Sequence, residues 1–492
     1  MATDHSGELM KALVAKLYAT ITGDDEDIKM PRHKYVTWFL PGIPFNAVDF
    51  RYCAKGFTGS TAEEVRENYH NAFVISKLFG FVPDVSKEMV TFDEMQQTIF
   101  TTTQDSIHSI FRDILNHSRV LHKELSDKEK EKLQKYRDLL QVTVDEEDIL
   151  TGENKKVTKP GKLTLAYNAK MIEYMEAADE YMNLKIDAQS ASGDDPEAKR
   201  RVHAWANKSK FLRKKMEAAY MAWVSQGYKN EYEIINAYID QIGRSDLVRY
   251  KQDLLFKLEA SLMTSPDDGD FYYTTLLPGN FATSPGWTQF NFYEGDYESH
   301  YNKKVSKWSA GGGLNLGLFS IGGRGSSQKT EVSQDQKSSN FRASLEFTQV
   351  QVFHAGFDYG FLNMRSWDLN DSWRLTYDTE VSDGKDKPVG RLVAYPVTAL
   401  FVRNVRFSMS EWERHSDYVK KNTKAGGFAS YGPFMIGGSY SAGSVKQDMN
   451  FHTEGGSIVI PGIQLVGFIN NIVPKCPNLN PNIKPEQLVG GE

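Results

Sequence analysis

The chain has 492 residues, of which 40% are hydrophobic and 25% are charged, and its formal net charge is −6 at pH 7. This balance is typical of a globular protein of two or three domains and excludes a protein that binds polyanions through its overall charge. Two cysteines, Cys53 and Cys476, are too few for a disulfide framework or a zinc cluster, so we expect a reducing compartment.

The N-terminal stretch MATDHSGELMKALVAKLYATITGDDED contains a short amphipathic run but lacks the basic start and apolar block of a secretory signal. No stretch reaches the about 18–20 uncharged apolar residues of a transmembrane helix. We therefore expect cytoplasmic synthesis, no signal peptide and no membrane-spanning helix, so that any release would bypass the secretory pathway. A β-hairpin that inserts after assembly remains compatible with this pattern, because its apolar residues alternate with polar ones.

Residues 1–60 form a mixed segment in which YVTWFLPGIPF predicts a strand and turn or a packed loop. From residue 61 to 265, apolar residues recur every three or four positions, which predicts a helical bundle divided by a charged connector at 145–161. Two helical stripes in this region are Met171, Met175, Ala178, Met182 and Ile186, and Leu212, Met216, Ala219 and Trp223.

Residues 266–492 have a different composition, rich in glycine, serine and aromatic residues, and their apolar period falls to two. This change predicts antiparallel strands. The expected architecture is therefore α+β and multidomain: an N-terminal and central helical bundle followed by an antiparallel β-sandwich-like domain with a duplicated glycine-rich hairpin.

The duplication is the most informative feature of the sequence. AGGGLNLGLFSIGGRGS at 310–326 and AGGFASYGPFMIGGSYS at 425–441 are identical at nine positions. A polar segment and another apolar run follow each copy, which predicts two long hairpins, at 310–353 and 425–468. Because glycine weakens a strand by about 0.5–1 kcal/mol relative to alanine, the clusters indicate close packing, sheet curvature or a conformational change.

Two interpretations of the hairpins follow. In the first, related hairpins face each other in a static sandwich and the glycines permit their approach. In the second, one or both hairpins insert into a bilayer, since residues 340–349 match the about 9–11 residues of a barrel strand. The side chains expected at the lipid or at a subunit contact are Leu314, Leu316, Leu318, Phe341, Leu345, Phe347, Phe434 and Ile436. In the second interpretation, Leu345→Arg would leave a folded protein that cannot permeabilise membranes.

A run of eight basic residues without an acidic one predicts a positively charged helix face. Such a face could bind a phosphate backbone or an anionic lipid surface. Acidic residues on the preceding helix, among them Glu173, Glu176 and Glu180, favour mutual neutralisation instead, and we expect no nucleic-acid partner. The basic residues are Lys199, Arg200, Arg201, Lys208, Lys210, Arg213, Lys214 and Lys215.

Motifs for catalysis or metal binding are weak. Ser441 lies in GGSYSAG without the glycine spacing of a nucleophile elbow, and the histidines and cysteines lack zinc-site spacing. We therefore predict no catalytic residue, metal site or cofactor. The favoured function is a non-enzymatic homo-oligomer that perturbs membranes as a β-hairpin pore former and meets a lipid bilayer after activation. The alternatives are a structural or partner-binding protein with glycine-rich strands at subunit contacts, and an enzyme of unrecognised class.

Overall fold

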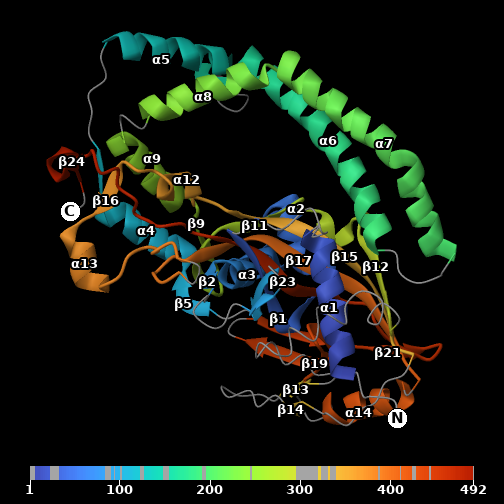
Figure 1. Ribbon diagram of the computed structural model, residues 1–492. Coiled ribbons are helices and arrows are strands. Elements are labelled where there is room, and N and C mark those ends of the chain that lie inside the picture. Colours follow the sequence, from blue (N-terminus) through green and yellow to red (C-terminus); the bar gives the residue numbers. More distant parts are fainter. Residues whose placement is uncertain are drawn as a thin grey trace.

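The computed structural model describes a mixed α+β body from which an arm of long helices extends (Figure 1). The α+β class predicted from the sequence is therefore confirmed. The described residues are 6–22, 31, 33–83, 90–92, 95–99, 102–121, 127–147, 154–190, 196–243, 247–294, 320–322, 331–332, 340–385, 388–410, 412–423, 428–442 and 445–490.

A ten-stranded sheet forms the centre of the body, with the strand order β11-β15-β17-β23-β1-β4-β3 and with β12, β21 and β22 pairing beside this path. Strand β1 pairs antiparallel with β23 and parallel with β4, so residues near both ends of the sequence share one sheet. The strands are β1 (Lys34–Phe45), β3 (Val90–Phe92), β4 (Met95–Ile99), β11 (Thr274–Leu277), β12 (Thr288–Tyr293), β15 (Arg342–His354), β17 (Ala394–Ser408), β21 (His452–Glu454), β22 (Ser457–Ile460) and β23 (Ile463–Ile472).

The central sheet is buried on both faces, and β17 illustrates how. Its side chains Leu400 and Val402 join the core that contains α1 (Ser6–Thr22), whereas Ala399 and Phe401 join a second core. That second core contains α3 (Ala62–Phe79). A strand between two cores needs apolar residues at consecutive positions, which explains the nearly continuous apolar run of β17.

A second, five-stranded sheet has the order β14-β13-β18-β19-β20 and packs on the α1 side of the central sheet. The side chain of Gln464, on β23, joins the two sheets. Its Nε2 donates to the carbonyl of Met435 at 2.9 Å, and its Oε1 accepts from the Met435 N–H at 2.7 Å. The strands are β13 (Ser320–Gly322), β14 (Glu331–Val332), β18 (Phe428–Tyr431), β19 (Phe434–Ala442) and β20 (Val445–Met449).

A third core lies at the end of the body from which the arm begins, and it is built around helices α4 and α9. Short strand pairs and triplets surround it. The remaining body elements are α2 (Arg51–Lys55), α4 (Ile107–His117), α9 (Leu247–Ala260), α12 (Tyr359–Leu362), α13 (Asp371–Tyr377), α14 (Trp412–Thr423), β2 (Phe81–Pro83), β5 (Thr102–Ser106), β6 (Ser118–Leu121), β9 (Leu262–Ser265), β10 (Gly269–Tyr272), β16 (Trp367–Leu369) and β24 (Leu488–Val489).

The arm consists of α5 (Asp127–Leu140), α6 (Lys162–Ser190), α7 (Pro196–Ser225) and α8 (Lys229–Gly243). Helices α6 and α7 pack along each other over 29 and 30 residues, so each is about 45 Å long. Stacked aromatic side chains join them, including Tyr174 on Trp223 with ring centroids 5.5 Å apart. Between α5 and α6, β7 (Gln141–Glu147) pairs with β8 (Asn154–Pro160).

Two expectations about local structure are wrong. The region 61–265 also contains strands, among them β5 and the pair β7 and β8 at the charged connector, because polar strands such as TTQDS carry no alternating apolar signal. The two apolar runs of 425–468 do not form one hairpin. Strands β18 and β19 lie in the second sheet, and β22 and β23 lie in the central sheet.

We predict that Gln464→Met lowers the free energy of unfolding by about 2–4 kcal/mol, because it removes two buried hydrogen bonds and leaves the Met435 backbone groups unsatisfied. Urea denaturation measures this loss. The exposed Gln252→Met on α9 is the matched control and should leave the midpoint unchanged. Equal midpoints for the two variants would contradict the bridging role of Gln464.

Candidate functional site

The candidate site is the apolar face of β12 and β15. The two strands pair antiparallel, with Phe290 opposite Leu345 and Phe292 opposite Ala343. Burial along β15 alternates as predicted, since Ala343, Leu345 and Phe347 are buried whereas Arg342 is exposed. Phe341, just before the strand, is also buried. One apolar face and one polar face is the pattern that a bilayer-inserted strand requires.

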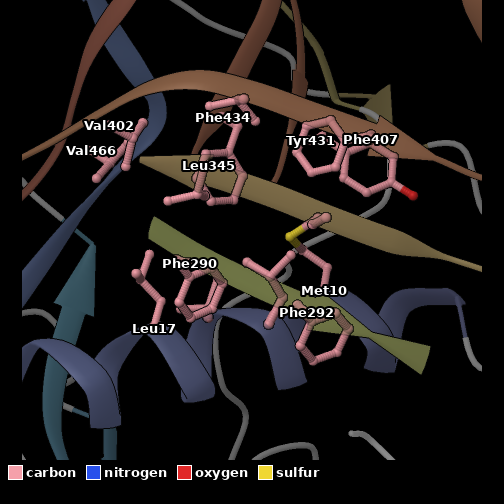
Figure 2. Packing of buried hydrophobic residues seen from close by; sticks show 14 of the residues in the cluster. Met10, Leu17, Phe290, Phe292, Leu345, Val402, Phe407, Tyr431, Phe434 and Val466 are labelled. Carbon is pink, nitrogen blue, oxygen red and sulfur yellow. The ribbon is translucent and has the colours of Figure 1, made fainter. Parts of the chain in front are cut away.

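Helix α1 covers this face. Figure 2 shows Met10 and Leu17 of α1 facing Phe290, Phe292 and Leu345. The sequence suggested an amphipathic run, but α1 is buried almost all round, and each residue from Leu9 to Tyr18 except Lys11 is buried. A helix that is apolar on all sides requires partners on all sides, and here the two sheets and α6 supply them.

Two polar contacts tie α1 to the strands beneath it. The Nζ of Lys16 donates to the carbonyl oxygen of Asn291 on β12 at 2.8 Å and lies 5.6 Å from the centre of the Phe290 ring. On β15, the Nε2 of Gln349 donates to the carbonyl oxygen of Ile21 at 3.0 Å. Both contacts use backbone acceptors, and they fix the position of α1 on these strands.

The polar face of β15 is held by a β-bulge. The register shifts between Ser344 and Glu346, and Asn404 on β17 takes a positive φ of 52°. Glu346 accepts hydrogen bonds from Arg403 at 2.6 Å and from Asn404 at 3.1 Å. Burial opposes the charge of Glu346, but these hydrogen bonds outweigh it and hold the pKa of the carboxyl below its ordinary value.

The two glycine-rich copies meet in the second sheet. The described part of the first copy, β13, pairs antiparallel with β18 of the second, with Ile321 opposite Ala429. Phe434 and Ile436, predicted contact residues, are buried in the core beside α1. Leu314, Leu316 and Leu318 lie outside the described residues.

One glycine of the second copy has a clear steric role. Gly432 forms the turn between β18 and β19 with a φ of 57°, which favours glycine. A Cβ at this position would lie 2.7 Å from the sulfur of Met10 on α1. Close approach of α1 therefore accounts for this position, which lies outside the glycine clusters.

The basic residues predicted as a patch lie along α7, on the arm. Lys199, Arg200, Lys208, Lys210, Arg213, Lys214 and Lys215 are exposed, and Arg201 is half-buried. One ion pair joins Lys215 to Glu180 of α6 at 2.6 Å, whereas Arg201 and Arg213 pair with Glu197 and Glu217 of α7 itself. Within the parts of the chain described, Lys208, Lys210 and Lys214 form no ion pair. Neutralisation by α6 is therefore less extensive there than the sequence suggested.

Two buried histidines lie where α4 meets the end of β15. The ring of His108 stacks on Tyr272 at 4.9 Å and meets the ring of His354 at 5.7 Å. Each Nε2 lies near a backbone carbonyl oxygen, of Ala355 at 3.0 Å and of Pro396 at 2.9 Å, so both must carry the proton that is donated. Sequence reasoning missed this pair, because the two residues are 246 positions apart.

Burial lowers the pKa of both rings. For His108 the pKa falls to about 3, with a smaller lowering contribution from His354, against the opposing hydrogen bond to Ala355. For His354 the pKa falls to about 4, against the hydrogen bond to Pro396. Both imidazoles are consequently neutral at pH 7, and protonation of either places a charge in the core.

Several acidic side chains of the described residues are engaged in local contacts. Asp268 lies 2.9 Å from Nδ1 of His70, Asp270 accepts from Thr264, and Glu173 pairs with Lys170. Among the described residues, no group of three or more His, Cys, Asp or Glu side chains could hold a metal ion. Burial raises the pKa of the Cys53 and Cys476 thiols, which disfavours the nucleophilic thiolate.

Comparison of the chain with protein-family models, with curated proteins and with solved structures found no match. Over the described residues, no helix is both long enough and apolar enough to cross a membrane.

The burial of Leu345 changes the expectation for Leu345→Arg. The side chain is 1% exposed and faces α1, so arginine would place an unpaired charge in the resting core. We predict that this variant has a free energy of unfolding lower by about 3 kcal/mol or more, a cost typical of an uncompensated buried charge. Urea denaturation measures this loss. The conservative Leu345→Met should cost less than about 1.5 kcal/mol. A stable, folded Leu345→Arg would contradict the packing of β15 under α1.

The histidine pair predicts a loss of stability in acid. In the unfolded chain both rings bind protons near pH 6.5, whereas in the folded protein they bind only near pH 3 and 4. The free energy of unfolding should therefore be maintained above pH 6.5 and fall toward pH 4, by about 1.4 kcal/mol per pH unit for each proton. Urea titrations at successive pH values measure this slope.

The double variant His108→Gln with His354→Gln should reduce that slope, because glutamine keeps a donor without titrating. His203→Gln, at an exposed position on α7, is the matched control and should retain the full slope. If the wild type and the double variant lost stability in parallel between pH 7 and pH 4, the buried pair would not be the acid-sensitive element.

Proposed function

We propose that this protein is a non-enzymatic, self-associating and membrane-perturbing protein in which the sheet face under α1 becomes the membrane-inserting or subunit-joining surface. The observation that carries the proposal is the packing of α1 on this face, beside Tyr431 of β18, with α1 held to β12 and β15 by the two contacts of Lys16 and Gln349. Departure of α1 would expose a continuous row of apolar side chains, Phe290, Phe292, Ala343, Leu345 and Phe347.

The strand dimensions support an insertion role for β15. Its 13 residues exceed the about 9–11 needed to cross a bilayer, and its apolar and polar faces alternate over residues 342–347, beyond which Val350 and Val352 are buried on the opposite face. Neighbouring β17 is a weaker candidate, because consecutive residues such as Leu400 and Phe401 are buried on opposite faces. Insertion of β17 would expose the apolar side chains of one of its two faces to the water-filled side of a barrel.

Self-assembly without a bilayer is the second candidate function. Among the described strands, β12 pairs with β15 alone. A strand with one open edge can pair with a strand of another copy, and backbone hydrogen bonds then supply the contact. This arrangement favours a homo-oligomer whether or not membrane insertion follows.

The test locks α1 to the strands. Ile21→Cys and Gln349→Cys, introduced together in a Cys53→Ser background, place thiols where a hydrogen bond joins the two elements. A short bismaleimide can bridge them. We expect the unbridged protein to release dye from liposomes and to form rings visible by electron microscopy. The bridged protein should release less than about a tenth as much.

Each single-cysteine variant treated with the same reagent serves as the control and should remain active. Equal release by bridged and unbridged protein would contradict departure of α1. Discrete assemblies in solution without dye release, at neutral and acidic pH, would favour the second candidate function.

A further inference from the structure

Helix α7 has one side that faces away from the rest of the molecule. Trp205, Leu212 and Trp223 lie on the side toward α6, where they are buried or half-buried. Figure 1 shows α7 on the side of α6 that is remote from the β-sheets. The opposite side of α7 is formed by exposed residues at spacings of three and four, namely His203, Asn207, Lys210, Lys214, Ala218 and Met221.

This outer side carries more positive than negative charge, since Glu217, the acidic residue beyond Lys214, pairs with Arg213. Lys210 and Lys214 lie one turn apart on it, and Arg200 lies near its beginning. The two lysines form no ion pair within the residues that the structure places, and Arg200 contacts the carbonyl oxygen of Pro196 rather than a carboxylate. From Lys199 to Lys215 the helix has eight basic residues and no acidic residue.

Large apolar side chains lie beside these charges. Phe211 is 70% exposed and Met221 is 61% exposed. Cations interleaved with exposed apolar side chains are typical of helices that lie in the interface of an anionic bilayer. The cations contact the headgroups, and the apolar side chains enter the acyl boundary.

We propose that the outer face of α7, defined by Arg200, Lys210, Phe211, Lys214 and Met221, binds the surface of an anionic lipid bilayer. Charge complementarity favours an anionic surface. The exposed side chains of Phe211 and Met221 favour a lipid bilayer over a nucleic acid, because the nucleic-acid backbone has no apolar region into which they could insert. The assignment of this face as the first membrane contact of a pore former rests on the proposed function, whereas lipid binding itself does not.

The test measures co-sedimentation of the full chain with phosphatidylserine/phosphatidylcholine vesicles and with phosphatidylcholine vesicles. Each basic residue beside an anionic surface increases partitioning about fivefold. We therefore expect Arg200→Gln, Lys210→Gln and Lys214→Gln together to reduce binding to the anionic vesicles on the order of 100-fold. Phe211→Ser with Met221→Ser should reduce it on the order of 100-fold or more. Raising the salt concentration should weaken wild-type binding.

The matched control removes three exposed lysines from the body, by Lys55→Gln, Lys257→Gln and Lys484→Gln, and should bind like the wild type. Equal urea midpoints show that every variant is folded. Unchanged vesicle binding by the α7 triple variant, or an equal loss in the body variant, would overturn the proposal. Absence of wild-type vesicle binding together with α7-dependent binding to duplex DNA would also overturn it.

Dye release from the same vesicles separates this inference from the proposed function. Binding that depends on α7 without release supports the lipid surface and contradicts pore formation. Release that the triple variant retains in full, with unchanged binding, contradicts the lipid surface and leaves pore formation supported.

Discussion

Helix α1 lies between two β-sheets, and burial of its side chains on every side is the constraint on which the arrangement of the body depends. Leu17 faces Phe290 of β12 (Figure 2), and Met10 also approaches the turn at Gly432 in the second sheet. The polar atoms of α1 obey the same constraint, since Lys16 and Thr20 both donate to backbone carbonyls.

Sequence periodicity identified the elements whose environment is one-sided. The alternation of Ala343, Leu345 and Phe347 with polar residues predicted a half-buried strand, and β15 has that pattern. Periodicity failed where an element is enclosed. The apolar run of α1 indicated an amphipathic helix, because one sequence does not reveal that Ala12 and Ala15 face another layer of the fold. The strands near the charged connector carried no signal, since their pairing depends on backbone groups rather than on side-chain burial.

Long-range contacts formed the second class of features that a single sequence could not predict. Gln464 hydrogen-bonds to Met435, and the ring of His108 contacts the ring of His354. The residues of each pair are separated in the sequence, so local patterns do not predict these contacts. The pairing of β13 with β18 is an intermediate case. The similarity of the two glycine-rich windows showed that they are related, but not that their strands are neighbours in one sheet. For the arm, the methionine stripe predicted a packed helix face, yet Met175 is 58% exposed, because a pair of helices covers fewer sides than a bundle.

The enclosure of α1 also limits when it could leave. The helix buries nine apolar side chains, Leu9, Met10, Ala12, Leu13, Val14, Ala15, Leu17, Tyr18 and Ile21. Transfer of a large apolar side chain to water costs about 1.5–3 kcal/mol, so exposing the seven large ones would cost about 10–20 kcal/mol, as much as the about 5–15 kcal/mol that holds a typical domain folded. Departure of α1 into water is therefore not a separate step that thermal fluctuation could supply. Another apolar surface must therefore replace α1 as the helix leaves. In dilute solution, where no such surface is present, the apolar face of β12 and β15 stays covered.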